Sequence, residues 1–161
     1  MKLKKLLTAS AVAIAVTAFG NMALAQSEEE KAKACDLKNL VQSGTLQFSM
    51  TRIGFLVAVR WGEGVLTLNN GEQYSFDVSG AKLLETGIST AKFEGEVYNL
   101  KNRKDFEGTY FGASTQITVV KGKGELRTNN SNCVTIRARS TGGGLSVSGP
   151  APEGLAIKFE N

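Results

Sequence analysis

The sequence predicts an all-β protein, a small antiparallel β-barrel with a β-sandwich as the alternative. Apolar and polar residues alternate with a period of two along most of the chain after residue 45, and glycine-containing turns separate the alternating segments. About 8–10 short strands of this kind form a barrel or a sandwich, and closure into a barrel removes exposed strand edges. Helix-like composition is confined to a short stretch between Gln26 and Gly44.

The first 25 residues have the pattern of a secretory signal peptide. A lysine-rich segment at 2–5 precedes an apolar run that extends to Phe19, and Ala23-Leu24-Ala25 forms an A-x-A cleavage site. A retained membrane anchor is disfavoured, because the apolar run is shorter than the roughly 20 residues of a membrane-spanning helix. The expected divisions are a signal peptide cleaved after Ala25 (1–25), a charged leader with a short helix (26–44) and one β-barrel domain (45–161).

Export changes the electrostatic interpretation of the chain. The formal charge of +4 falls to +1, because three lysines leave with the signal peptide and no acidic residue does. The exported chain also lacks a cluster of basic residues interleaved with aromatic residues. We therefore expect no nucleic-acid partner.

Cys35 and Cys133 are the only cysteines, and both travel into an oxidising compartment if the chain is exported. An intramolecular disulfide is the leading interpretation, and it would contribute about 2–4 kcal/mol to stability. Two free thiols, intermolecular pairing and lipid attachment at Cys35 are the alternatives. Lipid attachment is disfavoured because charged residues at 28–31 separate the A-x-A site from Cys35.

Three segments, centred on Phe76, Ile136 and Ile157, show the clearest alternation and predict strands with one face in a core. Asn69-Asn70-Gly71 predicts a hairpin turn, because asparagine and glycine tolerate positive φ angles. Further strands are expected at about 45–50, 53–60, 64–69, 89–98, 108–120, 124–128 and 144–148. Most are shorter than the about 9–11 residues of a membrane-spanning strand, so we expect a barrel that does not span a membrane.

The absence of histidine from the chain excludes the usual catalytic triads and histidine-based metal sites. Glycoside hydrolysis needs two opposed carboxyl groups. Glu94 with Glu96 and Asp105 with Glu107 are the candidate pairs, but lysines and arginines are interspersed with them, as on a solvated surface. We therefore expect no enzymatic activity, no cofactor and no transition metal.

Four motifs follow one another over roughly residues 55–159. They are Arg60-Trp61-Gly62-Glu63-Gly64 with Leu66 and Asn69, Val97-Tyr98-Asn99-Leu100, Gly108-Thr109-Tyr110-Phe111, and ARSTGGGLSVSGPAPEGLAIKF at 138–159. In order and spacing they resemble the envelope-integrity protein A family of Gram-negative bacteria. The Ser-x-Gly-Gly-Gly-Leu-Ser-Val segment within the last motif is also similar to the end of the SYLF lipid-binding domain. The cysteine pair and the short segment before the first strand depart from the family pattern.

The resemblance implies an exported small β-barrel that helps to maintain the cell envelope and has no assigned reaction. We expect a non-catalytic protein of the periplasm that acts by binding or scaffolding. The alternative, supported by the SYLF similarity, is a carrier or binder of a lipid or another apolar ligand. The expected partner is an envelope lipid or another envelope protein, and the oligomeric state stays open.

The candidate ligand-binding residues are Arg60, Trp61, Glu63, Tyr98 and Phe111. Trp61, the only tryptophan, is expected either to plug one end of the barrel or to line the mouth of a ligand site, and Tyr98 and Phe111 are expected at the same mouth. The glycines at 62 and 64 predict a β-bulge, and bulges are common at barrel rims beside binding sites. Arg60 would then pair with an acidic headgroup.

Overall fold

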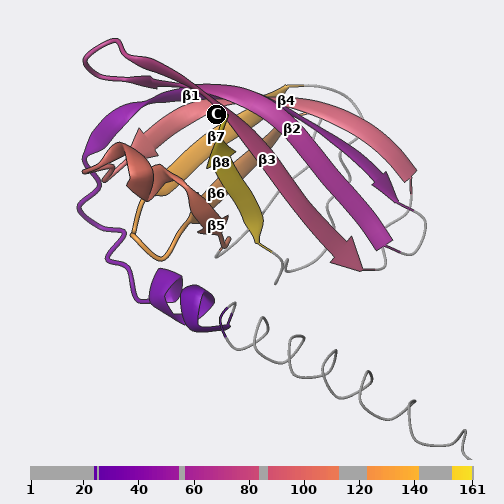
Figure 1. Ribbon diagram of the computed structural model, residues 1–161, viewed down its shortest axis with the longest axis horizontal. Helices are drawn as coiled ribbons and strands as arrows, with labels where there is room; N and C mark the ends of the chain where they lie inside the picture. Colours follow the sequence, from indigo (N-terminus) through magenta and orange to yellow (C-terminus); the bar gives the residue numbers. More distant parts are fainter. Residues whose placement is uncertain are drawn as a thin grey trace, which may run out of the picture.

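The structure, a computed structural model, describes residue 24 and the ranges 26–54, 57–83, 87–112, 123–141 and 154–160 (Figure 1). These ranges are mostly strand, with a helix at 26–33 and one 3₁₀ helix, η1 (Arg103–Phe106). The all-β class and the short helix near the amino terminus are confirmed. Residues 1–23 of the predicted signal peptide, the predicted strand at 144–148 and the end of the one at 108–120 lie outside the described residues.

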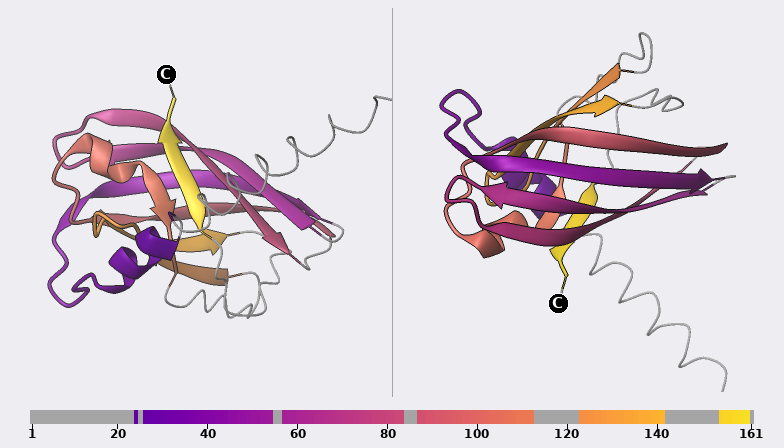
Figure 2. Two further views of the ribbon diagram at one scale, coloured as in Figure 1. Left: turned by 60° about the horizontal axis from the view of Figure 1, so that its bottom comes forward. Right: turned by 90° about the horizontal axis from the view of Figure 1, so that it is seen from above.

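Eight strands of the described ranges form one antiparallel sheet in the order β5-β8-β3-β2-β1-β4-β7-β6. They are β1 (Gln42–Gly54), β2 (Val57–Leu68), β3 (Gln73–Leu83), β4 (Gly87–Tyr98), β5 (Gly108–Tyr110), β6 (Lys123–Asn129), β7 (Thr135–Thr141) and β8 (Leu155–Phe159). Phe111, directly after β5, and Asn129 of β6 exchange backbone hydrogen bonds of 2.9 and 3.0 Å. This bridge joins the two edges, so the sheet is a nearly closed barrel (Figure 2).

Strands β1 to β4 are longer than the sequence predicted, with 13, 12, 11 and 12 residues. Where three short strands were expected at 45–50, 53–60 and 64–69, the chain forms β1 and β2. The expectation of short strands is therefore wrong for half of the sheet. The four long strands extend to the end of the molecule opposite η1 (Figure 2), which we call the far end.

The predicted β-bulge at Gly62 and Gly64 is also wrong. The register of β1 with β2 is unbroken between the pairs Gly44–Leu68 and Gly54–Ala58. Both glycines lie within the ladder, and a Cβ at Gly62 would overlap the carbonyl oxygen of Ser49 on β1. The glycines thus allow close approach of the two strands without an inserted residue.

The hairpin turn predicted at Asn69-Asn70-Gly71 joins β2 to β3. Gly71 has a φ of 88°, and its N–H donates to the carbonyl oxygen of Leu68 at 2.9 Å. Of the three turn residues only the glycine takes a positive φ, where it avoids the steric cost of a side chain.

The core is aromatic next to η1. The rings of Phe48 and Phe93 stack with their centroids 4.6 Å apart, and Phe106 of η1 meets Phe76 edge-on at 5.2 Å between centroids. Phe106 is fully buried, so η1 closes this end of the barrel. The alternations centred on Phe76, Ile136 and Ile157 are confirmed, because all three side chains are buried in the same core.

The leader is fastened to the barrel by a disulfide between Cys35 and Cys133, whose Cα atoms are 5.4 Å apart across a sequence separation of 98. Beside it, Asn129 Nδ2 donates to the carbonyl oxygen of Ala32 in the leader helix at 2.7 Å. The predicted disulfide is confirmed, and it is consistent with an oxidising, exported compartment. Within the described ranges, neither helix combines the length and apolar character that a membrane crossing requires.

The turn between β6 and β7 also holds η1 in place. Asn130 is buried, and its Oδ1 accepts the backbone N–H groups of Asn132 and Val134 at 3.0 and 3.1 Å. Its Nδ2 donates to the carbonyl oxygen of Asp105 at 2.7 Å. One side chain therefore shapes the turn and anchors the helix that closes the barrel.

Candidate binding surface

The structure does not bring the predicted site residues together. In the ladders of β1, Trp61 lies opposite Thr51, whereas Tyr98 lies opposite Gln42. These two positions are nine residues apart on one strand, which corresponds to about 30 Å. Phe111 lies near the η1 end, in the bridge with Asn129. Trp61 therefore shares no mouth with Tyr98 or Phe111.

Strand β2 carries three exposed apolar side chains on the outer face of the barrel. Val59, Trp61 and Val65 are 52, 45 and 39 % exposed. By the period of two, the intervening positions, among them Arg60 and Gly62, share the inner face with buried Leu66. Trp61 is thus outside the core, and its interpretation as an internal plug is wrong.

Ile53 extends this surface onto the neighbouring strand. It lies opposite Val59 in the β1–β2 ladder and is 45 % exposed. We call Ile53, Val59 and Trp61 the outer apolar patch; it lies on the far half of the β1–β2 hairpin. Sequence reasoning named only Trp61. The missed signal is that the apolar residues at 59, 61 and 65 are out of phase with the core residue Leu66.

Arg60 occupies the inner face at the same level. It is half-buried and lies opposite Arg52 on β1 and Gly80 on β3. Two arginine positions therefore face each other in the β1–β2 ladder near the far end.

Glu63 lies in a shallow depression of about 530 Å³ on the outer face. Its neighbours in the ladders are Ser49 on β1 and Asp77 on β3. Lys92 and Glu160 also line the depression, and its floor reaches Phe48 beside Gly64. The lining is mainly polar and of mixed charge, which suits a solvated surface better than an apolar ligand.

Tyr98 belongs to a separate groove of about 500 Å³ on the outer face of β4, β7 and β6. Its hydroxyl donates to Glu96 Oε2, and this hydrogen bond raises the pKa of Tyr98 above the ordinary value of 10.0. The guanidinium of Arg137 lies 5.4 Å from the centre of the Tyr98 ring.

The carboxylates of this groove are neighbours of arginines. Glu94 lies opposite Arg139, and Glu96 opposite Arg137, in the β4–β7 ladder. Both glutamates are exposed on one face of one strand. They do not face each other across a cleft, which is the geometry that glycoside hydrolysis requires.

The second candidate pair, Asp105 and Glu107, accepts hydrogen bonds from the backbone. Asp105 Oδ2 accepts the backbone N–H of Asn102 at 3.2 Å, at the start of η1. Glu107 Oε1 accepts the backbone N–H of Phe159 on β8 at 3.0 Å. Both carboxylates therefore have a structural role, because they hold backbone N–H groups at the end where the barrel closes.

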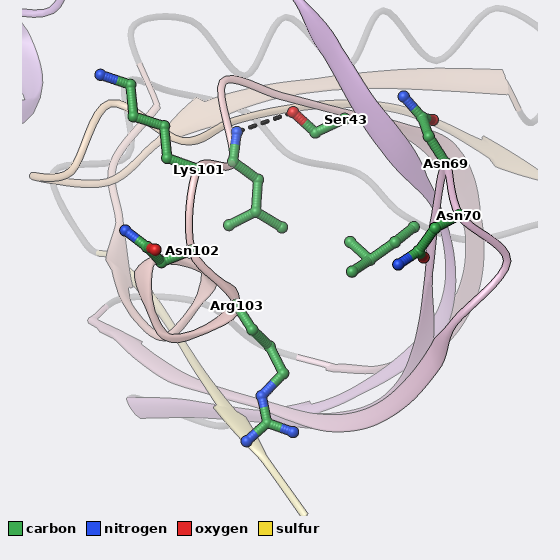
Figure 3. A pocket seen from close by; sticks show the side chains of 8 residues that line it. Ser43, Asn69, Asn70, Lys101, Asn102 and Arg103 are labelled. Atoms are coloured by element: carbon green, nitrogen blue, oxygen red, sulfur yellow. Dashed lines mark hydrogen bonds between the residues drawn. The ribbon is translucent and has the colours of Figure 1, made fainter.

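A smaller pocket, of about 220 Å³, lies between the β2–β3 turn and the loop before η1 (Figure 3). The N–H of Leu100 donates to Ser43 Oγ at 2.9 Å across it. Arg103 lies at its border, with its guanidinium 4.9 Å from the centre of the Tyr74 ring. These contacts join the loop before η1 to β1 and η1 itself to β3, which gives the pocket a structural explanation.

Among the residues that the structure describes, no three His, Cys, Asp or Glu side chains are grouped so as to hold a metal ion. Comparisons with family models, with curated proteins and with solved structures found no match. The resemblance to the envelope-integrity protein A family therefore stands on the sequence motifs alone.

Proposed function

We propose that the protein is an exported, non-catalytic component of the cell envelope that supports envelope integrity by binding. The observation that carries this proposal is the outer apolar patch. Single exposed apolar residues are ordinary on a protein surface, but adjoining ones mark an interaction site. Ile53 and Val59 are direct cross-strand neighbours, and Trp61 follows on the same face of β2.

Three features support the periplasm as the compartment. The segment before Gln26 has the pattern of a cleaved signal peptide. The disulfide between Cys35 and Cys133 suits an oxidising environment. The family that the motifs resemble is exported by Gram-negative bacteria.

The contacts of the four candidate carboxylates support a non-catalytic role. Glu94 and Glu96 lie beside arginines on an open face, and Asp105 and Glu107 accept backbone hydrogen bonds. Binding rather than chemistry is the function that these surroundings favour.

Complementation of a strain that lacks the gene tests the proposal. We expect the deletion to lower detergent resistance and the unaltered gene to restore it. Trp61→Ser removes the largest apolar side chain of the patch and should restore little resistance, while circular dichroism shows a folded protein. Val41→Ser is the matched control, because Val41 is 69 % exposed and lies before β1, at the η1 end.

Two outcomes would contradict the proposal. A deletion strain with full detergent resistance would remove the envelope role. Full complementation by Trp61→Ser would separate the patch from that role. Native mass spectrometry of the protein purified from the envelope fraction distinguishes a lipid carrier from a protein that binds without a carried ligand. A lipid carried by the barrel would appear as added mass.

A further inference from the structure

We propose that the far end of the β1–β2 hairpin inserts its outer apolar patch into the surface of an anionic lipid bilayer. The inference rests on the proposed function, because it names the partner that the patch would bind.

The polarity of the two sheet faces is reversed at Arg60 of β2, whereas Gly62, the next inner position, lies between the core residues Met50 and Val78. Val59 and Trp61 are on the outer face, whereas Arg60 and Gly62 occupy the inner face together with Leu66. A barrel surrounded by water places apolar residues inside. Strands in contact with lipid show the opposite pattern, with apolar residues outside and polar residues inside. The reversal is local, because near η1 the same strand points Leu66 into the core.

The position of the patch suits shallow insertion. Trp61 is four residues from Val57, the first residue of β2 at the far end. That length of strand is about 13 Å, or about 9 Å of depth at a tilt of about 45°. Apolar faces at bilayer interfaces are buried by about 5–10 Å, and tryptophan is enriched at the headgroup level. Glu63, the next outer residue of β2, would then lie above the headgroups.

The charge distribution identifies the bilayer as anionic. The described residues of the far end, 50–54, 57–62, 78–83 and 87–91, contain three basic residues and no acidic one. The basic residues are Arg52, Arg60 and Lys82. The connection between β3 and β4 adds one acidic residue in sequence, Glu85. Since the exported chain carries only +1 in total, its positive charge is concentrated at this end, which orients the barrel toward an anionic surface.

Trp61 provides the readout, because it is the only tryptophan in the chain. The protein purified from the envelope fraction is mixed with vesicles of zwitterionic phospholipid alone or with added anionic phospholipid. We expect co-sedimentation with the anionic vesicles, a shift of Trp61 emission to shorter wavelength, and quenching by brominated acyl chains. Raising the salt concentration should weaken binding, because salt screens the attraction to the headgroups.

Variants that leave Trp61 in place locate the contact. Val59→Ser and Ile53→Ser should each weaken vesicle affinity roughly tenfold. Val41→Ser makes the same type of change at the η1 end and should leave the affinity unchanged. Arg60→Ala should reduce the preference for anionic over zwitterionic vesicles, with its melting temperature measured to confirm a folded barrel.

The inference is overturned if vesicles leave Trp61 emission unchanged, or if Trp61 of the bound protein stays open to aqueous iodide. Loss of complementation by Trp61→Ser together with no vesicle binding would indicate a protein partner, and the proposed function would stand without the bilayer. Vesicle binding through the patch with no envelope defect in the deletion strain would have the opposite meaning: the bilayer contact would stand and the proposed envelope role would fail.

Discussion

At the scale of single residues, the buried hydroxyl of Tyr110 must stay protonated for the barrel to be stable. Its side chain is buried, and its hydroxyl donates to the carbonyl oxygen of Phe106 at 2.8 Å. Burial, and to a lesser extent the nearby Asp105 carboxylate, raises the pKa of Tyr110 well above the ordinary value of 10.0. The hydroxyl must keep its proton while the barrel is folded, because ionisation would place an unsolvated charge beside the residue that closes the core.

The stability of the protein should therefore fall at alkaline pH. The folded-state pKa of Tyr110 is raised, so its contribution is complete below the unfolded pKa of about 10 and is lost as the pH rises through the folded value. Tyr110→Phe should cost about 1 kcal/mol at neutral pH, from the lost hydrogen bond, and should reduce the alkaline loss. Urea unfolding at a series of pH values measures both effects.

Tyr98→Phe is the control for this titration, because Tyr98 lies outside the core in the charged groove. It should keep most of the alkaline loss. An alkaline loss of unchanged size in Tyr110→Phe would contradict the role given to the buried hydroxyl.

At the scale of the elements, the β1–β2 ladder depends on glycine. A Cβ at Gly64 would lie 2.5 Å from both Phe48 Cβ and Phe76 Cζ, and both aromatic rings are buried in the core. Gly80 on β3 is less crowded, because the nearest atom to its added Cβ would be the Gly154 carbonyl oxygen at 3.3 Å. An added methyl group should therefore be tolerated better at Gly80 than at Gly64.

Gly64→Ala should destabilise the protein by about 1–3 kcal/mol, because the added methyl group overpacks the aromatic core. Gly80→Ala should cost less, since only a small shift of its neighbours is needed. The urea concentrations at the unfolding midpoints of the two variants compare their losses of stability, provided that the two unfolding curves have the same dependence of free energy on urea concentration. Equal losses for the two substitutions would show that backbone entropy or strand propensity, rather than crowding at Phe48 and Phe76, sets the cost.

The sequence predicts elements well where one face is buried along the whole strand. The alternations around Phe76, Ile136 and Ile157 identify core residues because those side chains point into one interior. The prediction fails in β2, where Val59 and Trp61 point outward. Period-two alternation shows that two faces differ in polarity, but it does not show which of them is the inner one.

Other features depend on contacts between distant residues. Phe106 comes from a 3₁₀ helix of four residues, too short to have a periodic pattern, and its burial depends on rings supplied by other elements. The candidate site was likewise only partly predictable. Trp61 and Arg60 were identified by residue type, but their distance from Tyr98 follows from strand register, which local sequence does not encode.

At the scale of the whole molecule, the closure of the barrel and the attachment of the leader meet at one end. Asn129 bridges to Phe111 through the backbone and to Ala32 through its side chain. The disulfide of Cys35 with Cys133 lies in the same region. The outer apolar patch lies at the opposite end of β1 and β2. One end thus carries the closure of the barrel and the disulfide, while the other carries the outer apolar patch.

The last prediction follows from this separation. Reducing the disulfide, or replacing both cysteines with Cys35→Ser and Cys133→Ser, should lower the free energy of unfolding by about 2–4 kcal/mol, because the unfolded chain gains conformational entropy. The barrel should still fold, since its core draws on all eight described strands. Urea unfolding measures the loss, and intact mass should show no alkylation of the native protein before reduction. Vesicle binding by the double variant should match that of the oxidised protein below its melting temperature. Weakened binding by a folded double variant would instead show that the two ends are coupled through the long strands.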